Sequence, residues 1–249
     1  MLQQEYVQKV CERINWIAQT EKEPIRQAAG LLADAICRDR LIYVFGAGGH
    51  TSLAVGEMFF RVGGLANIYP ICEHGLSALS CARTFLALER CKGLGGSLIE
   101  ASGLGKDDVL LVIHTIGVNA SCIDAALKAK ELGANVIGIA SSHWQDETPQ
   151  GAVIRHESGK NLRDVADIFV DDGNTVADAV LNKPALKTPV GPVSGIGTFA
   201  LCRIMELEAI DICLERGIEP PIWNNANTPR GTQQNERLLA RFSPRIPAL

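Results

Sequence analysis

The chain has 249 residues, of which 47% are hydrophobic and 21% charged, and its formal net charge at pH 7 is −4. This composition supplies a large apolar core and excludes wholesale disorder. The slightly acidic balance excludes a general attraction to nucleic acid or to anionic membranes. No charged-then-apolar leader begins at Met1 and no apolar run is long enough to span a bilayer, so we expect a cytoplasmic protein.

Apolar residues at the start of the chain recur at helical spacing, and this pattern predicts an N-terminal helical arm over residues 1–38. The period then changes, because residues 41–45 form a continuous apolar run that ends at Gly46. Such a run is typical of a strand buried on both faces. An apolar helix is predicted from about Thr51 to Val62.

Strands and helices then alternate to residue 217. Further strands are predicted at 67–71, 109–113, 136–140 and 168–170, and further helices at 77–90, 97–101, 119–132 and 194–215. This alternation predicts parallel βαβ units with helices on both faces. The fold class is therefore α/β, a doubly wound, three-layer α/β/α, mainly parallel sheet over residues 39–217. Residues 218–249, rich in Pro and Asn at their start, are predicted to form an extended tail that packs on the domain or on a partner subunit.

Two predicted strand ends carry polar, glycine-bearing turns that lead into helices, at 46–52 and at 114–119. Ligands of open α/β sheets bind beyond the carboxyl ends of the strands. Glycines let the backbone approach an anion, and a helix N-terminus presents unsatisfied N–H groups. The two turns together predict a phosphate or sugar site. The candidate binding residues are Gly48, Gly49, His50, Thr51, Ser52, Thr115, Gly117 and Asn119.

A nicotinamide-binding Rossmann domain is a rival interpretation of the first turn. Gly46 and Gly48 supply two places of the Gly-x-Gly-x-x-Gly fingerprint, and Glu73 could mimic its ribose-binding acid. Thr51 occupies the third glycine place, however, and the fingerprint leaves the second turn unexplained.

Glu57 is the one carboxylate of the predicted helix at 51–62. At about 100° per residue, it shares a polar stripe with His50 and Arg61 on an otherwise apolar helix. The stripe allows two interpretations. Glu57 and Arg61 form an ion pair on a solvated edge, or Glu57 is a general base at the mouth of the sugar site.

The eight cysteines form no Cys-x-x-Cys pair, and most lie in apolar stretches. We interpret them as reduced thiols and predict neither a disulfide framework nor a metal site. Ser194 opens the predicted helix at 194–215 as an expected N-cap.

The chain resembles the sugar isomerase (SIS) domain family. The segments 43–52 and 108–119 are similar to the two phosphosugar loops of that family, and 124–141 is similar to the helix and strand that follow. A bacterial subfamily of stand-alone SIS proteins is closer still. The segments similar to it are 61–64, 158–160, 164–171, 191–194 and 215–221.

The resemblance implies a flavodoxin-like SIS fold and a nucleotide-free sugar-phosphate site shared between the subunits of a homodimer or homotetramer. In the enzymes of the family a glutamate on the first helix commonly acts as the base, and Glu57 lies nearest that place. The turn at Ser194 lies near the sugar in this family. Three features depart from the pattern. The first loop carries an additional residue, so His50, Thr51 and Ser52 are all candidates for the usual serine role. In the second loop His114 and Ile116 replace the usual serines, and no histidine follows His156.

We therefore predict a protein that binds a phosphorylated sugar and acts as an aldose–ketose isomerase through an enediol. Glu57 would remove the proton next to the carbonyl group, and His114 would move protons at the oxygens. The reaction needs no cofactor. The leading alternative is a non-catalytic sugar-phosphate sensor that regulates a partner, and the remote alternative is the Rossmann protein.

Overall fold

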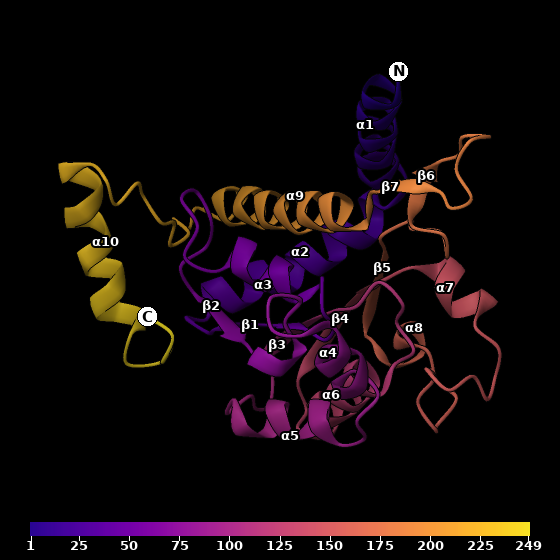
Figure 1. Ribbon diagram of the computed structural model, residues 1–249. Helices are drawn as coiled ribbons and strands as arrows, with labels where there is room; N and C mark the ends of the chain where they lie inside the picture. The colour runs from indigo at the N-terminus through magenta and orange to yellow at the C-terminus, as the bar shows by residue number, and fades with distance from the viewer.

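A computed structural model describes residues 1–249, with a five-stranded sheet at the centre (Figure 1). Every neighbouring pair of strands is parallel, and their order is β2-β1-β3-β4-β5. The strands are β1 Ile42–Gly46, β2 Ile68–Ile71, β3 Val109–Ile113, β4 Asn135–Ala140 and β5 Ile168–Asp171. The predicted doubly wound α/β fold is confirmed. This order is flavodoxin-like, with its switch point between β1 and β3, and differs from the classic dinucleotide-binding order.

Helices cover both faces of the sheet because its strands are apolar on both sides. Along β1, Ile42 and Val44 enter one core, while Tyr43 and Phe45 enter the other. Figure 1 shows α2, α3 and α9 on one face and α5 and α6 on the other. The helices are α1 Leu2–Thr20, α2 Lys22–Cys37, α3 Ser52–Met58, α4 Ala82–Leu88, α5 Leu94–Ala101, α6 Ala120–Glu131, α7 Ser142–Glu147, α8 Leu162–Val165, α9 Ser194–Glu215 and α10 Pro229–Phe242, with a 3-10 turn η1 at His74–Leu76.

Two segments extend from this three-layer body. The first is α1, which buries only Ile17 and rises away from the body in Figure 1. The second is a small antiparallel hairpin beside it, formed by β6 Ala179–Leu181 and β7 Val190–Pro192. No helix combines the length and the apolar character that are needed to cross a membrane.

The helix after β1 is shorter than predicted. It ends at Met58, because Phe59 is extended and Phe60 has a φ of 51°. The chain that follows pairs with the C-terminal segment, where the Gly63 N–H donates to the Trp223 carbonyl at 2.9 Å. The Phe60 ring packs edge-on against Trp223, with centroids 4.7 Å apart. These contacts with a segment distant in sequence override the helical pattern.

The prediction of an extended tail is wrong for residues 229–242, which form α10. Thr228 caps this helix by accepting a hydrogen bond from the Gly231 N–H at 3.1 Å, and Pro229 occupies its first turn. Both are standard start signals for a helix. Phe242 is fully buried in the core on the α5–α6 side of the sheet.

Candidate functional site

The candidate site lies at the carboxyl ends of β1 and β3, which are adjacent in the sheet. Gly46 at the end of β1 is in register with Ile113 at the end of β3. The two polar turns therefore begin side by side, and the Ser121 hydroxyl at the start of α6 donates to the Ala47 carbonyl of the first turn at 2.6 Å. A cavity of about 320 Å³ opens above them. It is lined by Gly48, Gly49, His50, Thr51, Phe85, Leu86, Glu89, His114, Thr115, Ile116, Trp144, Asp178 and Ser194.

The first turn keeps two backbone donors unused. The Gly48 N–H donates to the Thr51 hydroxyl at 3.1 Å, and the Gly49 N–H donates to the Glu89 carboxylate at 2.9 Å. The N–H groups of His50 and Thr51 have no acceptor within the protein. Both residues line the cavity, so this turn offers two amide donors to a ligand.

The second turn also has two backbone N–H groups without an acceptor in the protein. Its Gly117 N–H donates to Nδ1 of His114 at 3.0 Å, and Gly117 has a φ of 68° that a side chain would strain. The N–H groups of Thr115 and Ile116 have no acceptor within the protein. Four free amide donors from two turns therefore surround one cavity.

His114 is buried at the cavity wall, with 2% of its surface exposed. Burial lowers its pKa below the ordinary value of 6.5, although the negative charge of Glu89 opposes the shift. The imidazole is therefore neutral at pH 7. Because Nδ1 accepts the Gly117 hydrogen bond, the proton of the neutral ring is assigned to Nε2.

Glu89 is a cavity residue that the sequence did not reveal. It follows α4, is 7% exposed, and its second carboxylate oxygen accepts from the Asn119 amide at 3.2 Å. A side chain added at Gly48 would have its Cβ 2.8 Å from Oε1 of Glu89 and 2.9 Å from Nε2 of His114. The two groups therefore face the same space beside Gly48. In the sequence, Glu89 precedes Arg90 at the end of the helix predicted at 77–90. Nothing in this pattern distinguishes it from an acid on the protein surface.

The opposite wall comes from α9 and the segment before it. Val193 is the N-cap of α9, so the prediction that Ser194 caps this helix is wrong. Ser194 is instead the first helical residue, and its N–H and its hydroxyl both donate to the Asp178 carboxylate at 3.0 Å. A further space of about 20 Å³ reaches from Ser194 to Thr198, whose buried hydroxyl has no partner.

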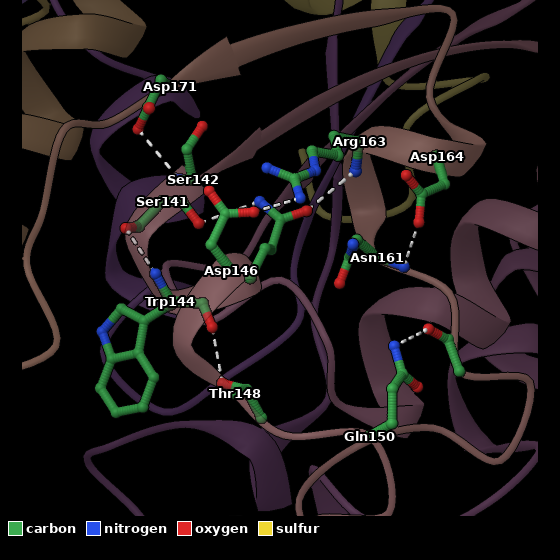
Figure 2. A network of polar contacts seen from close by, with 12 residues as sticks. Ser141, Ser142, Trp144, Asp146, Thr148, Gln150, Asn161, Arg163, Asp164 and Asp171 are labelled. Carbon is green, nitrogen blue, oxygen red and sulfur yellow. Dashed lines mark hydrogen bonds and ion pairs between the residues drawn. The ribbon is translucent and has the colours of Figure 1, made fainter.

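Trp144 completes the wall from α7, and Figure 2 shows the polar network around it. The Trp144 N–H donates to the Ser141 hydroxyl at 3.1 Å, and its carbonyl accepts from the Thr148 hydroxyl at 2.6 Å (Figure 2). The same helix is tied to α8 by an ion pair between Asp146 and Arg163. These bonds fix the backbone of α7, which carries the Trp144 side chain at the cavity edge.

The predicted site residues fall into three groups. Seven line the cavity: Gly48, Gly49, His50, Thr51, His114, Thr115 and Ser194. Ser52, Gly117 and Asn119 lie behind the wall, where they brace the turns; for example, the Ser52 hydroxyl donates to the Gly49 carbonyl at 2.7 Å. Glu57 does not line the cavity.

Glu57 forms the ion pair that the sequence left as one of two possibilities. Its Oε1 lies 3.1 Å from Nε of Arg61 and 3.8 Å from Nη2 of Arg203 on α9. Glu57 therefore faces α9 and does not line this cavity, and its role as a base at the mouth of the sugar site stays a prediction. Arg61 lies beyond the helix, yet the pair with Glu57 is kept.

Behind the second turn lies a buried carboxyl group. Asp172 follows β5 and is fully buried, and its pKa is raised to about 6 because burial disfavours the charged form. One carboxylate oxygen accepts a hydrogen bond from the Asn174 N–H at 2.9 Å, and the other has no hydrogen-bond partner. No three His, Cys, Asp or Glu side chains come close enough together to hold a metal ion.

Known proteins are similar to this chain over nearly its whole length, and a family model matches its N-terminal half. A family model described as the SIS domain matches residues 5–141. A UPF0309 protein of Geobacillus kaustophilus is 33% identical over 245 residues, which cover 98% of this chain and 96% of that protein. A UPF0309 protein of Streptomyces coelicolor is 32% identical over 244 residues, which cover 97% and 95%.

Two solved structures are similar in fold. Phosphoheptose isomerase of Neisseria gonorrhoeae is 18% identical with a TM-score of 0.51, over 85% of this chain and all of that one. The Vibrio vulnificus NanR protein complexed with ManNAc-6P is 12% identical with a TM-score of 0.54, over 96% of this chain and 69% of that one. From the matched family model and from relatives above 30% identity over nearly the full length, this chain belongs to the SIS domain family.

Proposed function

We propose that the cavity at the ends of β1 and β3 binds a phosphorylated sugar and interconverts its aldose and ketose forms through an enediol. One observation carries the binding half of this function. The free N–H groups of His50, Thr51, Thr115 and Ile116 come from two adjacent turns and surround one cavity. Backbone donors grouped in this way favour an anion such as phosphate.

The rest of the cavity suits a small polyol. Its volume of about 320 Å³ lies at the lower end of the range of ligand pockets, roughly 300–1,000 Å³. Thr51, Ser194 and His50 supply polar groups for sugar hydroxyls, while Phe85 and Trp144 supply apolar walls. No Lys or Arg lines the cavity, so the phosphate would be held by neutral donors.

Isomerisation is favoured over mere binding by His114. A neutral imidazole with its proton on Nε2 can polarise a carbonyl group and pass protons between neighbouring oxygens. The fold is also that of phosphoheptose isomerases. A non-catalytic sensor is the second candidate. Ile116 gives the second turn an apolar side chain, and the NanR protein complexed with ManNAc-6P shares the fold.

We also propose that copies of this chain associate. On α9, Ile196, Leu207 and Leu214 are 42%, 51% and 58% exposed. At about 100° per residue they lie on one side of the helix, within roughly 20° of each other. An exposed apolar stripe of this kind supports association. Light scattering coupled to size-exclusion chromatography would give a mass of at least two chains, and a monomer across micromolar concentrations would contradict it.

Binding is tested with a panel of hexose 6-phosphates and pentose 5-phosphates in a thermal-shift assay and by calorimetry. We expect at least one sugar phosphate to raise the melting temperature, while its unphosphorylated sugar does not. Thr51→Val should weaken that binding about tenfold or more, because the hydroxyl that shapes the first turn is lost. Thr20→Val, at an exposed position in α1, is the matched control.

Turnover is tested on each sugar phosphate that binds, by following aldose and ketose signals with NMR. Interconversion would support the isomerase. Binding without interconversion would support the sensor. Absence of binding across the panel would contradict both.

A further inference from the structure

On the basis of the function proposed above, we propose that Glu89 is the catalytic base of this site and that neutral His114 is its proton-donating partner. Glu89 would then be the catalytic base, a role that the resemblance to the family assigns to Glu57. The two glutamates differ in position, in charge partners and in what lies opposite them.

The two carboxylates differ first in their position relative to the cavity. Glu89 lines the cavity, and its carboxylate lies beside the first turn, where Oε1 accepts from the Gly49 N–H at 2.9 Å. Glu57 does not line the cavity and faces α9. A base must come within hydrogen-bond reach of the proton it removes, so of the two glutamates Glu89 is the one placed for this reaction.

Glu57 and Glu89 also differ in the groups that bond to their carboxylates. Glu57 is paired with the cations of Arg61 and Arg203. Glu89, though buried, is held by two neutral donors, the Gly49 N–H and the Asn119 amide, and forms no ion pair. No cation competes for its remaining lone pairs. Two donors on its oxygens also fix the carboxylate in one orientation, as a base that acts on one carbon requires.

Gly48 brings the base and its partner to one place. The position of a Cβ at residue 48 would lie 2.8 Å from Oε1 of Glu89 and 2.9 Å from Nε2 of His114. Glycine is needed there because both groups already pack against the backbone of residue 48, which places Glu89 and His114 close to each other. Base and proton donor would then act on neighbouring atoms of one bound molecule, as an enediol reaction requires.

The reaction balances with these two groups alone. Glu89 takes the proton from C2 of the aldose, and the electron pair of the broken C–H bond forms the C1–C2 double bond. The former carbonyl electrons move to O1, which takes the Nε2 proton of His114. His114 then regains a proton from O2, the C2–O2 double bond forms, and Glu89 returns its proton to C1. The ketose results, with no other reactant consumed.

The test compares Glu89→Gln with Glu57→Gln in the full-length protein. The probe is the hexose or pentose phosphate from the panel that stabilises the wild type most. Calorimetry gives its affinity, and NMR in D₂O gives the rate at which its C2 proton is replaced by deuterium. We expect Glu89→Gln to bind within about fivefold of the wild type and to exchange at least about 100-fold more slowly. Glu57→Gln should exchange within about threefold of the wild type.

Other results overturn the assignment in distinguishable ways. Exchange by Glu89→Gln within threefold of the wild type would remove Glu89 as the base, and a selective loss in Glu57→Gln would restore Glu57. If the wild type binds without exchanging, the sensor is correct and no base is needed. If no probe binds, the proposed function itself fails. Glu89→Asp, which keeps the carboxylate, should recover part of the exchange rate, whereas a merely structural role would not separate Asp from Gln in rate at equal melting temperature.

Discussion

Two glutamates near the first turn occupy contrasting surroundings. Glu57 lies at the α3–α9 contact, where two arginines neutralise it, and 32% of its side chain is exposed. Glu89 is 7% exposed at the cavity wall, and only neutral groups bond to it. Burying a carboxylate without a cation costs free energy that an ion pair would offset. A buried carboxylate without a charge partner, such as Glu89, is therefore the one to examine for chemistry.

The largest expected effect comes from displacing Glu89 and His114 with a side chain at residue 48. Gly48→Val would place side-chain atoms within about 3 Å of both groups, since a Cβ alone already lies at 2.8 and 2.9 Å. We expect sugar-phosphate binding to weaken about 100-fold or more by calorimetry. Gly30→Ala, where a Cβ meets nothing within 4 Å, is the control. Unchanged affinity in Gly48→Val would place the ligand elsewhere.

The second prediction concerns the partner of Glu89 in the cavity. His114→Gln keeps a group that can accept the Gly117 hydrogen bond but lacks the imidazole that moves protons. We expect kcat for aldose–ketose interconversion to fall about 100-fold, with KM changed less than about fivefold. His143→Gln, at an exposed position on α7, should leave kcat unchanged. Equal losses in both variants would argue against a specific role for His114.

Asp172 is a third buried acid: its carboxylate forms no ion pair, although Arg13 donates to its carbonyl at 3.4 Å, and it does not line the cavity. Its pKa is raised to about 6, so the folded protein binds its proton more tightly than the unfolded chain. This contribution to stability is present at low pH and is lost as the pH rises from about 4 to about 6.

Asp172→Asn does not titrate and should therefore be more stable than the wild type at pH 7, by about 2–3 kcal/mol. The advantage should shrink toward zero as the pH falls below about 4. Urea unfolding at pH 4 and pH 7 measures it. A wild-type protein that is the more stable of the two at pH 7 would show that the Asp172 carboxylate is compensated in the fold.

The smallest effect is expected for the stability of a variant at the partly exposed Glu57. Glu57→Gln removes a partly exposed ion pair, and such pairs contribute little because solvent screens them. We expect the free energy of unfolding to change by less than about 1 kcal/mol in urea titrations. A loss above about 3 kcal/mol would mean that Arg203 depends on Glu57 for its burial.

The sequence predicts the sheet because its signal is local. Runs such as Val109–Ile113 are apolar at every position, and only a strand buried on both faces needs that pattern. The two strand-end turns follow, since parallel strands bring their carboxyl ends to one edge of the sheet. The helix at 194–215 is predicted with its observed bounds, although its apolar residues are not gathered on one side of α9.

The features that sequence reasoning missed depend on contacts between distant residues. The end of α3 at Met58 follows from pairing of residues 63–66 with the tail, which helical periodicity does not reveal. Glu89 acquires its place through the Gly49 and Asn119 hydrogen bonds, 40 and 30 residues away. The start of α10 was available locally, in Thr228 and Pro229, and was outweighed by the Pro- and Asn-rich segment before it.

The most direct test of the site is an NMR titration of the uniformly ¹⁵N- and ²H-labelled protein with a stabilising sugar phosphate. The amides of His50, Thr51, Thr115 and Ile116 should show the largest shift changes and saturate together, while the unphosphorylated sugar leaves them in place. Largest changes at the separate cavity beside Lys9 and Arg13, with these four amides unmoved at saturation, would contradict a phosphate site between β1 and β3.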